Sequence, residues 1–144
     1  MGRFSKFLGF RGHSKYGNKK VEYEGIVFDS KKELQRFLVL KEAESNGLIT
    51  NLQRQVSFLL IPPVTEEYEV TLKTKTITKT RTAQRAVHYT CDFQYEKDGC
   101  LVVEDVKSAP IMAKNDKAYQ LRKKMLFAFH GIKIKEVFDA NKEI

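Results

Sequence analysis

The chain has 144 residues, of which 42% are hydrophobic, a size that suits one domain with a single modest core. Its 26 Lys and Arg residues outnumber its 18 Asp and Glu residues, and the formal net charge of +8 favours a polyanionic partner, most often nucleic acid. No run of about 18 apolar residues occurs and the N-terminus lacks the apolar core of a signal peptide, so we expect a soluble, cytoplasmic protein that does not contact membranes. The two cysteines, Cys91 and Cys100, are too few for a disulfide framework or a zinc cluster and are expected to be reduced core residues.

Residues 1–20 contain six Lys and Arg residues, four glycines and no acid. We interpret them as a flexible basic arm, with Lys15, Lys19 and Lys20 as candidates for contacts with nucleic-acid phosphates, and residues 21–144 as one domain. A frayed terminus without a role is the alternative.

Residues 21–28 predict a hairpin or a bulged strand, and a helix follows. Ser30 can cap this helix and Gly47 can end it. Residues 55–61 are rich in apolar residues and end at two prolines, so they predict a core strand. Gln55, at the start of this strand, is a secondary candidate for the functional site.

The segment from about residue 64 to residue 86 is an unusual insert. Thr and Ile favour an extended backbone here, whereas the many cations oppose burial. We expect a protruding basic β-arm or a flexible loop that grips phosphates; the alternative is an edge strand that lysines protect against aggregation. The candidate phosphate-binding residues in this insert are Lys73, Lys75, Lys79, Arg81 and Arg85.

Residues 87–108 predict two strands joined by a tight turn. Asp98-Gly99 favours a two-residue turn, and this register sets Asp92 directly opposite Asp105. Opposed side chains lie roughly 4.5 to 5.5 Å apart, where two carboxylates repel each other. A three-residue turn would set Asp92 opposite Glu104 instead; we favour Asp105, because it shares a face with Lys107 and Glu104 alternates to the other face.

A divalent cation would relieve the repulsion between these acids. Mg²⁺ prefers oxygen ligands and binds through one or two carboxylates while it keeps waters and substrate phosphates. An ammonium beside the metal, here Lys107, can offset the charge that develops on a phosphodiester during hydrolysis. The alternative is that each acid pairs with a nearby cation on an exposed sheet face. His88 lies on the Asp92 face of its strand and is a further secondary candidate for substrate contact. The simpler interpretation is a residue at the rim of the site.

Residues 115–131 predict a second helix, with Asn115 as its cap and Gly131 as its end, and residues 132–138 predict a last strand. Four residues form an apolar stripe at helical spacing on this helix: Ala118, Leu121, Met125 and Phe129. The element order predicts an α/β fold, in which a mixed sheet packs against helices.

The acid Asp92 on one strand, followed by Asp105-Val106-Lys107 on the next, resembles the PD-(D/E)XK, or restriction-endonuclease-like, nuclease superfamily. Three segments are similar to a small uncharacterised family, common in phages and prophages, that is thought to belong to that superfamily: "KYGNKKVEYEGIVFDSKKE", "YTCDFQY" and "VVEDVKS". The resemblance implies an αβββαβ core with a mixed central sheet flanked by helices.

The resemblance also implies site roles. Asp92, Asp105 and the backbone carbonyl of Val106 would hold Mg²⁺, with Mn²⁺ as a substitute, and Glu33 of the first helix would be a further metal ligand. The alternative for Glu33 is a capping box, in which its side chain bonds back to the Ser30 amide. Lys107 would orient the attacking water or stabilise the transition state.

Our first hypothesis is therefore a Mg²⁺-dependent endonuclease that hydrolyses DNA in a phage or prophage and binds mainly the phosphate backbone. The superfamily includes Holliday junction resolvases, so branched DNA is a candidate substrate and a homodimer a candidate assembly. The second hypothesis is a nucleic-acid-binding phage protein that keeps the fold without chemistry, and the third is a basic structural or partner-binding protein.

Overall fold

The computed structural model describes residues 19–144, so residues 1–18, which include Lys15 and most of the expected N-terminal arm, lie outside the described residues. The described chain begins with the antiparallel hairpin of β1 (Val21–Tyr23) and β2 (Ile26–Phe28), as predicted. Helix α1 (Lys31–Ser45) follows, and the Ser30 hydroxyl caps it by accepting a hydrogen bond from the Glu33 amide. No helix within residues 19–144 is long and apolar enough to cross a membrane.

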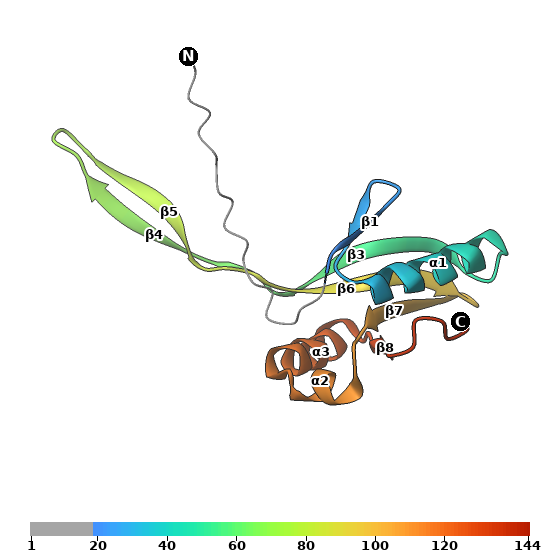
Figure 1. Ribbon diagram of the computed structural model, residues 1–144. Helices are drawn as coiled ribbons and strands as arrows, with labels where there is room; N and C mark the ends of the chain where they lie inside the picture. The colour runs from blue at the N-terminus through green and yellow to red at the C-terminus, as the bar shows by residue number, and fades with distance from the viewer. Residues whose placement is uncertain (1–18) are drawn as a thin grey trace, which may run out of the picture.

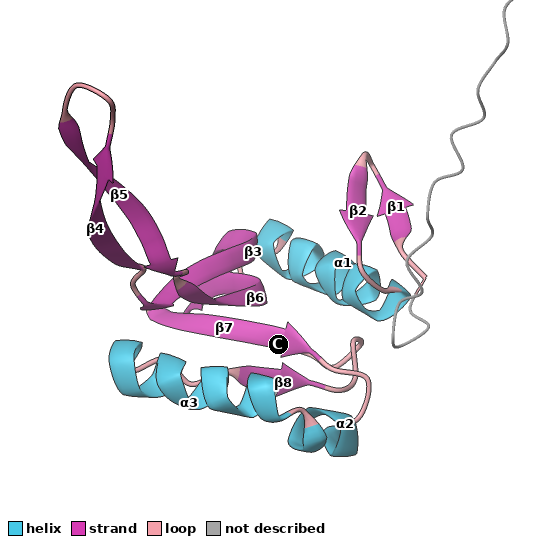
Figure 2. Ribbon diagram, turned by 90° about the vertical axis from the view of Figure 1, so that its left-hand side faces the viewer, coloured by secondary structure: helices cyan, strands magenta, loops and turns pink. Residues whose placement is uncertain are grey.

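A mixed sheet forms the centre of the fold. Its strands lie in the order β3 (Thr50–Ile61), β6 (Val87–Lys97), β7 (Cys100–Val106) and β8 (Lys135–Val137), and only the β7–β8 pair is parallel. Helix α1 covers one face, and α2 (Pro110–Asn115) and α3 (Lys117–His130) cover the other (Figure 2). The predicted α/β class, a mixed sheet between helices, is confirmed.

The insert between β3 and β6 is a two-stranded arm of β4 (Val64–Thr71) and β5 (Thr76–Gln84). Figure 1 shows the arm projecting away from the rest of the described chain. Within its strands only Val70 and Ile77 are half-buried, and all other residues are exposed. The prediction of a protruding β-arm is confirmed, but β4 also carries three acids that balance the cations of β5 and the tip: Glu66, Glu67 and Glu69.

Strand β6 contributes to a separate hydrophobic core on each face of the sheet. Tyr89 and Cys91 pack in the core under α3, whereas Phe93 and Tyr95 pack in the core under α1. Residues two apart on a regular strand share one face. The regular alternation is therefore broken between Cys91 and Phe93, at Asp92.

The apolar stripe predicted on α3 is largely exposed in the fold. The residues that α3 buries are Tyr119 and Leu126, whereas Leu121 and Phe129 are each 60% exposed. Polar contacts help to fix this orientation, because the Tyr119 hydroxyl donates to Glu136 of β8 at 2.8 Å. Helical spacing alone does not reveal that a tyrosine has a polar partner inside the fold.

Two smaller predictions are wrong. The cap of α3 is Asp116, whose carboxylate accepts from the Tyr119 amide at 3.0 Å, because Asn115 already ends α2. Cys100 is exposed rather than buried, since it follows directly on the β6–β7 turn; Cys91 is fully buried, as expected.

A buried ion pair ties α1 to the central strand β7. The Arg36 guanidinium donates to both carboxylate oxygens of Glu104, at 2.8 and 2.7 Å, and both side chains are essentially inaccessible. Tyr95 and Lys135 also donate to Glu104, at 2.7 and 2.8 Å, and Arg36 reaches the Lys142 carbonyl near the C-terminus. Burial opposes ionisation of Glu104, but these donors together hold its pKa below the usual value.

Arg36→Met should destabilise the protein by about 3 to 5 kcal/mol, because it leaves the Glu104 charge buried without its main partner. The double variant Arg36→Met/Glu104→Met removes both charges and should recover at least half of this loss. Urea denaturation of both variants measures the effect. A loss below about 1 kcal/mol for Arg36→Met would show that the pair does not hold α1 on the sheet.

Candidate active site

The turn between β6 and β7 fixes the position of the acids. Lys97 pairs with Cys100, and Asp98 and Gly99 form the turn with φ values of 51° and 75°. The two-residue turn is therefore confirmed. Continuing the register from the last pair, Phe93 with Glu104, sets Asp92 opposite Asp105, as predicted.

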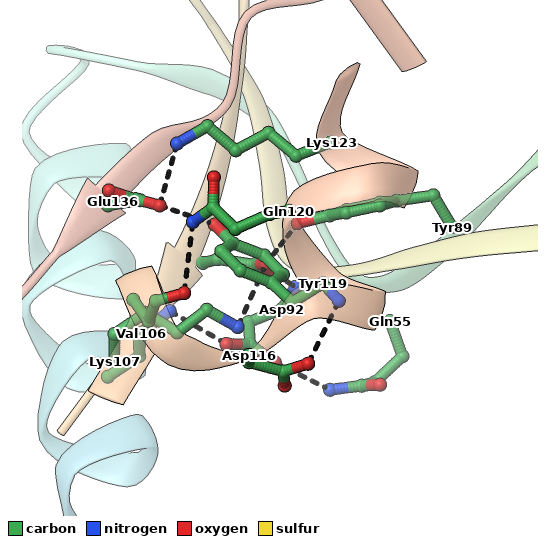
Figure 3. Close-up of polar contacts among 12 residues, drawn as sticks. Gln55, Tyr89, Asp92, Val106, Lys107, Asp116, Tyr119, Gln120, Lys123 and Glu136 are labelled. Carbon is green, nitrogen blue, oxygen red and sulfur yellow. Dashed lines mark hydrogen bonds and ion pairs between the residues drawn. The ribbon is translucent and has the colours of Figure 1, made fainter. Parts of the chain in front are cut away.

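The two strands separate at these acids. The pairing of β6 with β7 ends at Phe93 and Glu104, although β7 continues to Val106. Across the gap, the Asp92 amide donates to Asp105 Oδ1 at 3.1 Å. The Val106 amide donates to Asp92 Oδ2 at 2.7 Å, and Figure 3 labels both of these residues. The two carboxylates thus take the place of backbone carbonyls and satisfy the amides where the ladder opens.

Asp105 lies deeper in the gap than Asp92. It is 3% exposed, and its Oδ2 accepts a hydrogen bond from the Tyr89 hydroxyl and lies 3.3 Å from Lys107 Nζ. Burial and the Asp105 charge raise the pKa of Tyr89, so this phenol stays protonated and keeps donating. Lys107 also lies over the Tyr119 ring at 3.9 Å, which holds the ammonium beside the acid. The shared face of Asp105 and Lys107 is as predicted.

Asp92 has the most perturbed carboxylate of the site. Burial raises its pKa, the nearby Asp105 charge raises it further, and the pKa reaches about 7. The Val106 amide and Lys107 act in the opposite direction but do not cancel the effect. Asp92 therefore carries only part of its charge near neutral pH, and a cation bound beside it would complete the ionisation.

Gln55 connects Asp92 to the first helix. Its side-chain amide nitrogen lies 3.4 Å from Asp92 Oδ1 and 3.3 Å from Glu33 Oε1, so two carboxylates from different elements converge on one donor. Gln55 has a φ of 50°, which residues other than glycine rarely adopt inside a strand. The β3–β6 register places Gln55 opposite Asp92, where the alternation of β6 breaks. Strain of this kind occurs most often at functional sites.

Glu33 is 4% exposed and reaches the site from the first turn of α1. Its Oε2 accepts from the Asp29 amide at 3.2 Å rather than from the Ser30 amide, so only half of the alternative capping box forms, through the Ser30 hydroxyl. Arg54 lies 3.7 Å from Glu33 Oε1, yet burial, the larger influence, still raises the pKa of Glu33. One oxygen of Glu33 thus binds the backbone at the start of α1, and the other accepts from Gln55, which also contacts Asp92.

The structure separates the remaining candidates from the site. Glu104 points to the opposite side, toward Arg36, and its donors occupy it fully; its role is in the core. His88 is exposed, and its side chain makes no hydrogen bond within residues 19–144. Lys19 and Lys20 lie at the beginning of the described chain, where Lys20 pairs with Asp29 at 3.4 Å.

A cleft of about 780 Å³ opens beside Val106 and Lys107 at the end of β7, where the start of α1 and helices α2 and α3 also line it. Three lysines line it: Lys32, Lys107 and Lys117. Lys32 also donates to the Lys107 and Ser108 carbonyls, at 2.9 and 3.2 Å, and so fixes the end of β7 to α1. The sequence patterns did not single out Lys32 or Lys117, because their elements meet at the cleft only in the folded chain.

The donor set fits a metal held by two carboxylates. Within residues 19–144, no group of three or more His, Cys, Asp and Glu side chains is placed to hold a metal ion. The role of Glu33 as a third ligand stays a prediction. Mg²⁺ commonly binds through only one or two carboxylates and keeps several waters. Asp92 and Asp105 offer two carboxylates of this kind. The raised pKa of Asp92 reflects in part the repulsion between them, which a bound cation would relieve.

Asp92→Asn should stabilise the protein near pH 8 and change its stability much less near pH 4. The pKa of Asp92 rises from 3.8 to about 7 on folding, so the unfolded chain loses this proton first and stability falls as pH rises through this window. The asparagine removes this penalty, which is worth about 2 to 4 kcal/mol. Urea denaturation at both pH values measures it.

Asp98→Asn is the matched control, because Asn-Gly suits the same turn and Asp98 is exposed. It should show no such pH dependence. Equal effects of Asp92→Asn at the two pH values would contradict the perturbed pKa of Asp92.

Comparison with known proteins adds a family to this description. No curated protein and no solved structure matches the chain. A family model described as "Protein of unknown function (DUF1064)" matches residues 13–142, which include every element of the sheet and all three helices. The chain therefore belongs to the DUF1064 family.

Proposed function

We propose that this protein is a metal-dependent endonuclease that hydrolyses DNA phosphodiester bonds. The observation that carries the proposal is the opening between β6 and β7, where Asp92 and Asp105 face each other across the gap with Lys107 beside them. Two acids and a lysine in this arrangement, next to a lysine-lined cleft, suit hydrolysis of a phosphodiester.

The order of the elements supports the same proposal. Without the β1–β2 hairpin, the arm and the short helix α2, the chain runs α1, β3, β6, β7, α3 and β8, which is the αβββαβ order implied by the resemblance to restriction-endonuclease-like nucleases. Asp92 lies on the second of these strands and Asp105-Val106-Lys107 ends the third. We propose that the fold is of this type.

In this proposal Asp92 and Asp105, with the Val106 carbonyl, hold Mg²⁺, for which Mn²⁺ can substitute. The metal, when bound, would polarise the phosphodiester and lower the pKa of a coordinated water. Lys107 places its positive charge 3.3 Å from Asp105, where it can stabilise the negative charge that develops on the phosphate. Gln55 and Glu33 orient Asp92 from the side of α1.

The proposed DNA contacts lie on either side of these acids. The cleft has the volume of a small-ligand pocket and can admit part of a DNA strand next to the reacting phosphate. Lys73 and Lys75 lie in the tip of the arm, Lys79 and Arg81 lie on β5, and Arg85 directly follows β5; all five are exposed. Such cations position the DNA backbone without reading its sequence.

The cleavage test uses supercoiled plasmid and a synthetic four-way junction, each with and without Mg²⁺. Wild-type protein should nick or cut at least one substrate only when the metal is present. Asp105→Asn should lower the rate by about 100-fold or more, because it removes a metal ligand. Asp98→Asn, a carboxylate-to-amide change in the same hairpin, should stay within about twofold of wild type, since Asp98 lies at the turn on the other end of the strands. Cleavage without metal, or unchanged in Asp105→Asn, would refute the proposal.

The arm can be tested through the salt dependence of DNA binding. Lys73→Ala/Lys75→Ala should weaken binding to duplex DNA and reduce the slope of log K against log salt by about 1 to 2. Each phosphate contact that is lost lowers the number of counterions released on binding. Lys97→Ala, at the β6–β7 turn, is the control and should leave the slope unchanged. A slope that stays the same in the tip variant would remove the tip from the interface.

The second candidate is a protein that binds nucleic acid without cleaving it. The specific observation in its favour is that the described residues hold no group of three acidic, His or Cys side chains placed for a metal. Under this alternative, the wild-type protein would bind the same DNA with the same salt dependence, but no divalent metal would support cleavage. The plasmid and junction assay therefore separates the two functions.

A further inference from the structure

The two faces of the arm differ in chemistry. Because β4 and β5 pair in register, opposed residues share a face and successive residues alternate between faces. One face, which we call the Thr/Glu face, carries two acids and no cation; it consists of Thr65, Glu67, Glu69, Thr71, Thr76, Thr78, Thr80 and Thr82. The other face, the basic face, consists of Glu66, Tyr68, Val70, Ile77, Lys79 and Arg81.

Ion pairs strengthen this difference. On the basic face, Arg81 pairs with Glu66 at 2.5 Å and lies over the Tyr68 ring at 5.2 Å. The net positive charge of this face therefore comes from Lys79. On the Thr/Glu face, neither Glu67 nor Glu69 is part of an ion pair within residues 19–144. Phosphates would be repelled by the Thr/Glu face, so DNA binding gives this face no role.

Helix α3 presents a surface of complementary character. We call Ala118, Leu121, Met125, Ala128 and Phe129 the α3 stripe; they recur at spacings of three and four residues, so they lie on one side of the helix. Met125 is half-buried, and the other four residues are exposed. In a protein of this size an apolar helix stripe turned to the surface is typical of a contact site.

Cations surround the α3 stripe. At 100° per residue, Arg122 and Lys124 flank it on opposite sides, and α3 contains no acid. A second α3 stripe would bring like charges together, and so would the basic face of the arm. The Thr/Glu face offers threonine methyl groups for the stripe and two carboxylates for the flanking cations.

The lengths of the two surfaces match. The 14 residues of α3 extend about 21 Å and the eight residues of β4 about 26 Å, so one arm can cover the whole α3 stripe. The arm does not fold back on the helix of its own chain, since both views show it pointing away from the sheet and helices (Figures 1 and 2). The helix that it can cover is therefore that of a second copy.

We infer that the protein forms a two-fold symmetric dimer in which the Thr/Glu face of each arm covers the α3 stripe of the other copy. Each copy contributes one stripe and one arm, so the two-fold axis repeats the contact and doubles the area that the dimer buries. The basic face and the tip lysines stay exposed on the outside of the dimer. This inference is independent of the proposed nuclease activity.

Sedimentation equilibrium without DNA or metal tests the dimer. Wild type should have twice the 16.7 kDa mass of one chain at micromolar concentration. Arg122→Glu/Lys124→Glu and Glu67→Lys/Glu69→Lys should each weaken the dimer by about tenfold or more, because each places like charges in contact. The variant with all four changes pairs opposite charges again and should recover the wild-type dissociation constant within about threefold.

Two controls keep the result interpretable. Lys31→Glu/Lys97→Glu changes the net charge by the same amount elsewhere and should leave the dimer intact. Leu121→Asp should dissociate the dimer, whereas Leu48→Asp, at a site 61% exposed away from α3, should not. Three results would each overturn the inference. The wild type could be a monomer at about 100 µM, the two charge-reversal variants could dimerise as tightly as wild type, or the variant with all four changes could dimerise no more tightly than either of them.

Discussion

The site depends on how the sheet opens between β6 and β7. Where two strands diverge, their backbone amides lose their ladder partners, and buried amides need an acceptor. Here the carboxylates of Asp92 and Asp105 supply it, each accepting from an amide on the other strand. The same contacts that stabilise the opening therefore bring two acids together, and the nearby Asp105 charge adds to burial in raising the pKa of Asp92.

Several other features follow from this opening. The alternation of β6 changes at Asp92, which lets one strand fill the cores under both α1 and α3. Gln55, opposite Asp92, adopts a left-handed φ and links the acid to Glu33 at the start of α1. On the far side of β7, the Arg36–Glu104 pair fixes α1 in position. The proposed site and this buried ion pair thus occupy adjacent residues of β7, Asp105 and Glu104, on opposite faces of the sheet.

Much of this arrangement could be predicted from local sequence. The Asp98-Gly99 turn determines the register of its hairpin, and alternation then places Asp105 and Lys107 together and sends Glu104 to the other face. The protruding arm was predictable because its charges oppose burial. The link from Gln55 to Glu33 was not, since it depends on a backbone kink that no residue pattern marks. The apolar stripe of α3 was visible in the sequence but its exposure was not, because amphipathicity identifies an apolar face without showing whether the chain's own core covers it.

We propose that Asp92 and Asp105 form a carboxylate pair that binds a divalent cation. The most direct measurement is the pKa of the Asp92 carboxyl group. NMR titration of its side-chain carboxyl carbon, with and without Mg²⁺, gives this value. The structure predicts a pKa of about 7 without metal. Saturating Mg²⁺ should lower it by about two units or more, because the bound cation favours the ionised form. An Asp92 pKa near 4 without metal, or a raised value that Mg²⁺ leaves unchanged, would contradict the claim.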